Sequence, residues 1–465
     1  MASREERTRS WLVSWGRSGT GRPRRTSGVG HDMGDDHDLR RILAACRGEA
    51  ALRIQRAAAR EGLEVVGLVD PARDDAPEWA EVLAGATTVP ADARGRWPAV
   101  DGVVDAAVDA GCDAVYAGWG ARVRDPELGL AARRAGLLSI GPSPELLSVV
   151  ADRPGLRAVA EELGVPVVPG SEPLTDLAQA LAWLAWTGLP AAVRSLDPGL
   201  SGVHRVEDMQ SAEAVIERLL LYGPVMVERH VLGAREVEVP IIGDGSSRFV
   251  CLSNREITVR DGGIRVLTEA PAPTLSGAAR SEVMSYADAL ARQIGLRGVA
   301  SVRFLVPEDG RPYFLQVRPG VQPWHGVTEA LLGVDLVDAE LQLASGFPLF
   351  WRPGDVVYEG HAMALRVRAA RDGERVGGTR LDEGLRLDPA LVEGDRTRAG
   401  RALGTLVVTA PTRQACIVRA RATLERWPQA GVTPDLRVWG RLFDERAFWE
   451  GTLDREAVAS LQRDA

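Results

Sequence analysis

The types of charged residue in this sequence limit the chemistry that a binding or catalytic site in it can perform. The chain has no lysine, so all 56 side chains counted as Lys and Arg are arginines. A lysine ammonium is a compact point charge that phosphoryl-transfer sites use to hold phosphate, whereas arginine presents a planar fork on a longer stem. Any phosphate chemistry in this chain must therefore work without a lysine.

Histidine and cysteine show no metal-binding pattern. The histidines of the regular part of the chain lack a ligand spacing such as HxxxH, and the cysteines are far apart with no CxxC pair. We therefore expect structural histidines and reduced thiols, with no metal site and no disulfide framework. The residues concerned are His204, His230, His325 and His361, and Cys46, Cys112, Cys251 and Cys416.

Composition excludes two further classes of partner. The formal net charge is −8 and only 5% of residues are aromatic, so no basic footprint for nucleic acid is present. No run of about 18 uncharged apolar residues occurs, so no membrane span is expected. With 465 residues, 45% of them hydrophobic, the chain can build about three domains with substantial cores. We expect a folded, cytoplasmic protein.

The elements that must position any site alternate regularly in the first third of the chain. Residues 1–38 carry arginines among Ser, Thr and Gly without apolar periodicity, which predicts a disordered tail. From Arg41 onward, apolar strands alternate with helix-spaced segments, which predicts a parallel, doubly wound sheet. These strands are expected at 41–45, 63–69, 114–116 and 138–140.

A hinge at 163–170 leads into a different pattern. The following segments predict a mixed α and β region up to about residue 350, and after it short strands before a helix at 412–427. The expected elements of the middle region are a helix at 174–187 and strands at 190–194, 224–229, 236–242, 248–254, 300–306 and 312–318. Four tryptophans are expected in cores: Trp183, Trp186, Trp324 and Trp351.

Six stretches, spaced over some 320 residues, occur in an order that resembles one family. They are RGEAALRIQRA (47–57), LGVPVVPGS (163–171), EAPAP (269–273), GVTE (326–329), GVDL (333–336) and GHA (360–362). The chain from Arg41 resembles biotin carboxylase, an ATP-grasp enzyme of acyl-CoA carboxylases. The resemblance implies an α/β and α+β architecture of three domains. They are a doubly wound domain at 39–150, an ATP-grasp domain at 151–350 with a lid at about 168–240, and a mixed carboxy-terminal domain at 351–465.

The family, as the resemblance implies, phosphorylates bicarbonate with ATP and two magnesium ions and then carboxylates biotin. Arg153 and Arg194 fall where the family has nucleotide-contacting lysines. Glu228 falls on the adenine side of the pocket and Leu305 on its apolar face. The glycine-rich loop, here at 195–203, contains a proline and an aspartate that would make a weak nest for phosphate.

The metal ligands implied by the resemblance are replaced. Arg303 and Gln316 stand in place of two glutamates, and Arg318 in place of an asparagine. The replacement of glutamate by Arg303 raises the local charge by two, and the replacements at Gln316 and Arg318 raise it by one each. Magnesium, by contrast, needs hard oxygen ligands. Because a pair of unit charges 4 Å apart is worth about 4 kcal/mol at an effective dielectric near 20, conventional metal binding should be abolished.

The residues with which the family binds bicarbonate are, as the resemblance implies, replaced as well. The family's bicarbonate arginine aligns with Gly320, its catalytic-base glutamate with Trp324 and its lysine with Arg265. Gln322 and Arg386 are retained. An indole cannot accept a proton, so no general base remains there.

Two arrangements of these arginines stay open from sequence. Arg153, Arg194, Arg265, Arg303 and Arg318 could line an anion pocket, because guanidinium forks bind phosphate bidentately. Alternatively, Arg303 pairs with Glu269 or Glu238 and closes the site. Glu228 likewise either contacts a nucleotide or caps a strand edge near Arg229.

The resemblance also implies a dimer interface. Arg56 and Arg413 match residues of the family's homodimer interface, whereas Arg60 replaces an acidic member of it. Like charges would then face each other, so we expect either a heterodimer with an acidic relative or a solvated Arg60.

These observations favour a catalytically inactive, biotin carboxylase-like pseudoenzyme that partners, scaffolds or regulates an acyl-CoA carboxylase or a related ATP-grasp enzyme. One alternative is a metal-independent sensor of nucleotides or anions; another is an active ATP-dependent biotin carboxylase. No cofactor is expected unless ATP or ADP binds without magnesium. A biotin carboxylase-like protein partner is expected, but no nucleic acid, no membrane, and no covalent biotin, which needs a lysine.

Overall fold

The computed structural model describes residues 39–69, 83–89, 99–120, 122–197, 202–261 and 264–453, without the side chains of 261 and 264. The predicted disordered tail at 1–38 and the centre of the loop at 195–203 lie outside these residues. In the part of the chain that is described, no helix is long and apolar enough to cross a membrane.

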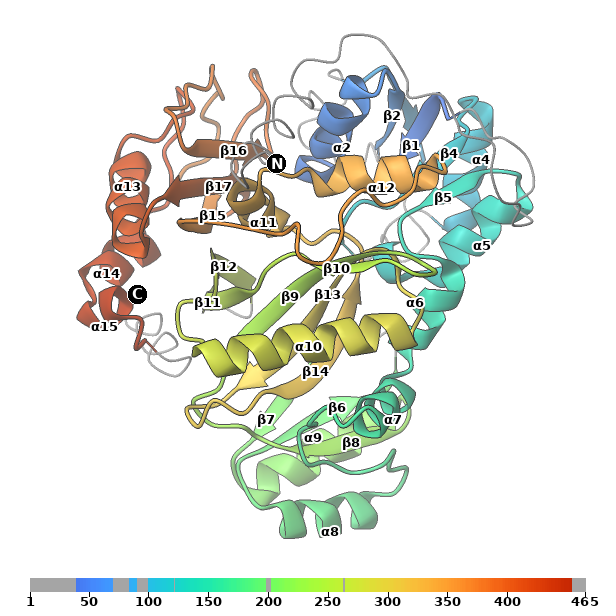
Figure 1. Ribbon diagram of the computed structural model, residues 1–465, viewed down its shortest axis with the longest axis vertical. Helices are drawn as coiled ribbons and strands as arrows, with labels where there is room; N and C mark the ends of the chain where they lie inside the picture. Colours follow the sequence, from blue (N-terminus) through green and yellow to red (C-terminus); the bar gives the residue numbers. More distant parts are fainter. Residues whose placement is uncertain are drawn as a thin grey trace, which may run out of the picture. The chain divides into compact units, whose positions relative to one another are not determined.

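The first sheet is parallel, with strand order β3-β2-β1-β4-β5, which confirms the predicted doubly wound domain (Figure 1). Alternate residues of β1 face opposite sides, as in any strand. Ile42 packs with α2 and α12, whereas Leu43 packs with α4 and α5. The elements are β1 (Arg41–Ala44), α2 (Glu49–Arg60), β2 (Glu64–Val69), β3 (Gly85–Thr88), α4 (Val100–Asp109), β4 (Ala114–Tyr116), the 3-10 turn η1 (Arg122–Arg124), α5 (Pro126–Arg134), β5 (Leu138–Ile140) and α6 (Pro144–Ala151).

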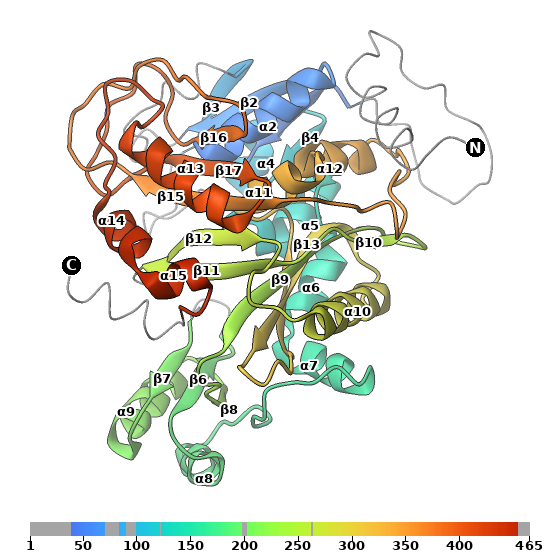
Figure 2. The same ribbon diagram turned by 60° about the vertical axis from the view of Figure 1, so that its left-hand side comes forward.

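A three-stranded antiparallel sheet of order β7-β6-β8 forms the lid with two helices. Both views place α8 beyond this sheet, on the side away from the larger one (Figures 1 and 2). The prediction that Trp186 lies in a core is wrong, because its side chain is 74% exposed on the outer face of α8. The elements here are α7 (Arg153–Glu162), α8 (Leu177–Thr187), β6 (Ala191–Ser195), β7 (His204–Val206), α9 (Met209–Leu220) and β8 (Val225–Arg229).

The largest sheet has nine strands in the order β14-β13-β9-β11-β12-β15-β17-β16, with β10 paired to β9. One face of β9, β13 and β14 is apolar and packs under α10. The strands β11 and β12 were not anticipated from the sequence. The elements are β9 (Arg235–Asp244), β10 (Phe249–Cys251), β11 (Arg255–Asp261), β12 (Ile264–Ala270), α10 (Gly277–Gln293), β13 (Arg297–Val306), β14 (Tyr313–Pro319), α11 (His325–Leu332) and α12 (Leu336–Ala344).

The carboxy-terminal strands continue this sheet, because β15 pairs with β12 from Leu365 opposite Leu267 to Ala362 opposite Ala270. The helix predicted at 412–427 is confirmed as α13. These last elements are β15 (His361–Arg368), β16 (Leu385–Pro389), β17 (Ala402–Ala410), α13 (Arg413–Glu425), α14 (Arg437–Asp444) and α15 (Arg446–Glu450).

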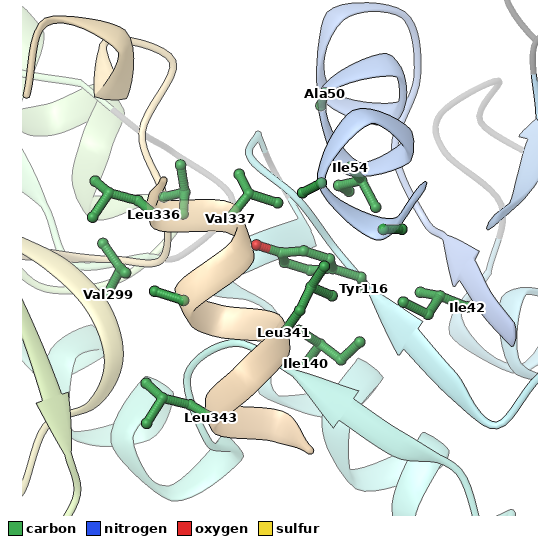
Figure 3. Packing of buried hydrophobic residues seen from close by; sticks show 14 of the residues in the cluster. Ile42, Ala50, Ile54, Tyr116, Ile140, Val299, Leu336, Val337, Leu341 and Leu343 are labelled. Atoms are coloured by element: carbon green, nitrogen blue, oxygen red, sulfur yellow. The ribbon is translucent and has the colours of Figure 1, made fainter. Parts of the chain in front are cut away.

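The helix α12 joins the first sheet to the large one through an apolar cluster. Leu336, Val337 and Leu341 of α12 pack with Ile54 of α2 (Figure 3). Tyr116 of β4 lies in the same cluster. The two sheets therefore share one core, which fixes the first domain against the strands that carry the site.

Candidate functional site

Charged side chains cover the face of the large sheet that is opposite α10. Cross-strand pairing places Arg303 beside Glu238 and Gln316, Arg255 beside Glu238, and Arg318 beside Ser301. We call this set the charged face. Its members are Gln316 and Arg318 on β14, Ser301 and Arg303 on β13, Glu236 and Glu238 on β9, Arg255 and Arg260 on β11, and Arg265 on β12.

Two glutamates stand at the centre of the charged face, and arginines surround both. Glu238 is fully buried, accepts a hydrogen bond from Arg255 at 2.9 Å and forms ion pairs with Arg265 at 2.7 Å and Arg303 at 3.3 Å. Burial raises the pKa of the Glu238 carboxyl, but Arg265, Arg255 and Arg318 outweigh it and bring the pKa to about 2. Glu238 is therefore a carboxylate at neutral pH, with its oxygens engaged by guanidinium groups.

Glu236 lies on β9 two residues before Glu238, on the same face of the sheet, and completes the network. Its carboxylate pairs with Arg303 and Arg260 and lies 3.5 Å from Arg265. Arg303 thus bridges both glutamates. The expectation that Arg303 pairs internally holds for Glu238 but not for Glu269, which instead contacts His361 at 3.0 Å and Arg413 at 2.7 Å.

A second cluster lies where the lid meets α7. Glu228 of β8 is buried and contacts Arg153 at 3.1 Å and Arg194 at 2.5 Å. Burial raises the pKa of Glu228, but Arg194 and Arg153 reverse the effect and bring it to about 2. Three of the predicted nucleotide-contacting side chains are therefore brought together, and they bind one another. Leu305, the fourth, lies half-buried on β13, two residues from Arg303.

The loop between β14 and α11 holds three further predicted positions. Trp324 is 5% exposed and packs in an apolar cluster with Ala270 and Val407. The Gln322 amide donates to the carbonyls of Pro319 and Gly320, both at 3.1 Å, so it is folded back onto its own loop.

Gly320 leaves no room for a side chain. Its φ is +75°, in the left-handed region, and a Cβ there would lie 2.4 Å from Cγ2 of Val123 in η1. A residue with a side chain is strained in this left-handed backbone conformation even where there is room for the side chain. The close contact of η1 with this turn therefore disfavours an arginine at position 320.

Arg386 of β16 is held on three sides. It donates to Glu329 at 2.6 Å and, in a bidentate contact, to both oxygens of Asp388 at 3.0 and 2.8 Å. His325 Nδ1 is 2.9 Å from the carbonyl of Gln322, and Arg386 lies 3.3 Å from Nε2. Burial lowers the pKa of His325, so the ring is neutral and Nε2 can accept from Arg386.

Family models match two parts of the chain. The model described as "Biotin carboxylase, N-terminal domain" matches residues 38–147, and "Carbamoyl-phosphate synthase L chain, ATP binding domain" matches 152–351. A biotin carboxylase of Pseudomonas aeruginosa is 29% identical over 437 residues, which are 89% of this chain and 96% of the relative. The chain belongs to the biotin carboxylase family.

Solved structures agree with this fold. A biotin carboxylase complex from Campylobacter jejuni matches with a TM-score of 0.84 and 21% identity, covering 91% of this chain and 99% of that one. The biotin carboxylase domain dimer of a Hydrogenobacter thermophilus 2-oxoglutarate carboxylase, solved with MgADP and bicarbonate, matches with a TM-score of 0.83, 20% identity and coverage of 91% and 97%.

The magnesium ions that the biotin carboxylase family implies do not fit the residues present. The resemblance places two metal-binding glutamates at positions 303 and 316. This chain has a cation at the first, Arg303, which pairs with Glu236 and Glu238, and an amide at the second, Gln316. With its amide oriented to satisfy its neighbours, the Gln316 oxygen accepts from Arg318 Nε at 3.0 Å and from Arg303. That oxygen is therefore engaged by guanidinium groups, which would repel a divalent cation.

The predicted interface arginines also have partners within the chain. Arg56 contacts Asp388 at 3.2 Å and Arg60 contacts Asp335 at 2.9 Å, although both arginines are partly exposed. Arg413 is largely buried against Glu269 and the ring of Phe448. Arg60 therefore faces a carboxylate of its own chain. The role of these three side chains in an interface stays a prediction.

Sequence reasoning missed three of the charged side chains in the charged face, namely Glu236, Arg255 and Arg260. A signal was present for Glu236, because the run from Glu236 to Val239 alternates charged and apolar residues and so points both glutamates to one face. For the other two the strand β11 itself was missed.

Proposed function

We propose that this member of the biotin carboxylase family is catalytically inactive and acts by binding, as a partner, scaffold or regulator of an acyl-CoA carboxylase or a related ATP-grasp enzyme. The observation that carries the proposal is Arg303, whose guanidinium bridges Glu236 and Glu238 in the corner where the family holds its metal. Trp324, buried where a base would be needed, supports it further.

The partner we propose is another biotin carboxylase-like subunit, the same chain or a relative. A structural relative is described as a dimer, which supports this choice. Arg56 and Arg60 remain partly exposed beyond their internal pairs, so their outer surfaces can still contact an acidic partner.

The direct test is bicarbonate-dependent ATP hydrolysis in the presence of free biotin and magnesium. The Pseudomonas aeruginosa biotin carboxylase, assayed in parallel, provides the positive control. We expect no hydrolysis above background, because the residues at 303, 316 and 324 supply neither metal ligands nor a base. A clear signal that Arg386→Ala abolishes would contradict the proposal and favour an active carboxylase.

A metal-independent sensor of nucleotides or anions is the second candidate, favoured by the surplus of arginine on the charged face. Thermal unfolding with ADP separates the two. An unchanged Tm supports the scaffold, and a rise that EDTA leaves intact supports the sensor. A rise that requires magnesium would contradict both.

A further inference from the structure

The helix α8 of the lid presents an apolar face to solvent. The helix contains no charged residue, and it buries Ala180 and Leu184 against the rest of the lid. Its exposed positions are Ala178, Gln179, Ala182, Ala185 and Trp186. A surface helix normally presents charged and polar side chains to water, opposite the apolar stripe that it buries. In the described part of the chain no other element covers this second apolar face of α8.

Trp186 is the largest side chain of the exposed face. Its ring stands edge-to-face against Trp183, with 4.8 Å between the ring centroids and 81° between the ring planes, so the exposed indole is held in place. Aromatic side chains of this kind are enriched in protein interfaces, because burying them removes a large area from water at a small cost in entropy. Both views show α8 as the outermost element of the lid, where a second molecule can approach it (Figures 1 and 2).

The spacing along this face is self-complementary. Ala178 and Trp186 lie four residues before and four residues after Ala182. If two copies of α8 pack antiparallel about a two-fold axis at Ala182, Trp186 of one copy lies over Ala178 of the other, and the reciprocal contact is identical. The small side chains of Ala178, Ala182 and Ala185 allow the helices to approach closely. Because α8 carries no charge, two copies meet without burying like charges.

The two ends of α8 carry opposite charges that suit the same arrangement. Asp176 is exposed at the N-terminal end, where its carboxylate accepts from the Gln179 N–H at 2.9 Å. Arg229 is exposed at the other end, opposite Ala191, the residue that begins β6 after α8. It shares with Val227 the face of β8 that packs under the lid helices. In an antiparallel pair, the acidic end of one helix therefore lies beside the basic end of the other.

We propose that α8 is an interface through which two copies of this chain associate by their lids. Such an isologous contact closes with two copies. A contact between two helices of 11 residues is smaller than the interface of a stable dimer, which buries about 1,200 Å² or more, so the association is reversible, with a Kd on the order of 10–100 µM. The inference goes beyond the proposed function and does not rest on it, because α8 is separate from the elements that carry Arg56, Arg60 and Arg413.

Sedimentation equilibrium of the full chain, at about 5 to 300 µM, measures this association. We expect the weight-average mass of the wild type to rise with concentration toward twice the value that Ala182→Glu reaches, because two glutamates would face each other at the two-fold axis. Trp186→Glu should have the same effect, and both variants should weaken association by roughly tenfold or more. Ala158→Glu is the matched control and should behave as the wild type, because Ala158 is an exposed alanine within α7, outside the lid helices.

Two milder variants test the antiparallel arrangement. Asp176→Asn keeps a side chain that caps the helix but removes the charge, and Arg229→Gln removes the charge at the other end. Each should weaken association by about two- to fivefold, and their effects should not add, as expected for residues in contact. Additive losses would overturn the antiparallel arrangement.

Two results would overturn the interface itself. One is a wild-type mass that stays constant with concentration, which would mean that a second copy does not cover α8. The other is association that survives in both Ala182→Glu and Trp186→Glu, which would place the contact on a different surface. Thermal unfolding of each variant checks that the fold is retained, and we expect an unchanged Tm because both side chains are exposed. The measurement uses neither ATP nor bicarbonate, so its outcome is independent of the carboxylation test.

Discussion

At the scale of single residues, the most unusual carboxyl outside the charged face is Glu340 of α12. It is buried between the two sheets, where it accepts from the Tyr116 hydroxyl at 2.5 Å and from the Val299 N–H at 3.0 Å. Arginines compensate the glutamates of the charged face, but no basic side chain in the described residues forms an ion pair with Glu340. Burial therefore raises its pKa to about 7.

We expect this glutamate to make stability depend on pH. Its pKa is higher in the folded state than the ordinary value of about 4.3 in an unfolded chain, so the folded state binds the extra proton. The contribution is thus present at low pH and is lost as pH rises from about 4.5 to 7. The loss is on the order of 3 kcal/mol in the free energy of unfolding.

Urea unfolding at pH 5 and pH 8 measures this effect, with Glu340→Gln as the comparison. The difference in unfolding free energy between the wild type and Glu340→Gln should shift in favour of the variant by a few kcal/mol from pH 5 to pH 8. A difference that is constant with pH would show that Glu340 titrates normally. Comparison with the variant also removes the contribution of Asp338, whose pKa burial likewise raises to about 7.

At the scale of elements, α2 carries a stripe of charged side chains that all pair with later parts of the chain. Glu49 contacts Arg366 of β15, and Arg53 contacts Glu329 at 3.0 Å and Asp335 at 2.6 Å. Positions 49, 53, 56 and 60 lie on one helical face, which explains why one helix can bind α11, α12, β15 and β16 together. The stripe fixes the first domain to the carboxy-terminal strands.

Burial decides how much each ion pair of this stripe contributes to the free energy of unfolding. Arg53→Met should lower the free energy of unfolding by about 3–5 kcal/mol, because it leaves Glu329 and Asp335 as buried charges with less compensation. The exposed Arg60→Gln, on the same helix and against the same Asp335, should cost less than about 1 kcal/mol. Chemical unfolding of both variants checks the prediction, and similar losses for the two would refute it.

The sequence predicted helices and strands where apolar periodicity was strong, and failed where charge interrupted it. The run from Arg255 to Asp261 forms β11 although most of its residues are polar, and so it lacks the apolar pattern expected of a strand. The replacements at Arg303, Gln316 and Trp324 could be found by resemblance. The partners of these residues could not, because cross-strand contacts such as Glu236 with Arg303 join segments that are distant in sequence.

At the scale of the whole chain, the large sheet continues without a break from the predicted ATP-grasp domain into the carboxy-terminal domain. β12 and β15 pair directly, and Glu269 of β12 is neutralised by Arg413 of α13. Residues 351–465 therefore complete both the sheet and the ion pairs of the preceding domain.

We accordingly expect residues 39–350, expressed alone, to fail to fold cooperatively. The truncation would open the edge of β12 and leave Glu49, Glu269 and Glu329 without their arginine partners from the last third. Size-exclusion chromatography and thermal unfolding measure the outcome, and co-expression with residues 351–465 should restore material that unfolds in one transition. A monodisperse 39–350 fragment with a sharp transition would contradict this expectation.

The contact between Gly320 and Val123 has an evolutionary consequence. A variant of this protein with an arginine at position 320, where the resemblance places the family's bicarbonate arginine, would suffer both a steric clash with Val123 and an unfavourable backbone conformation. A smaller residue at 123 would have to appear first, and by itself it would only leave a cavity. Any mutational route to an arginine at position 320 therefore passes through less stable intermediates, so selection can hardly follow it.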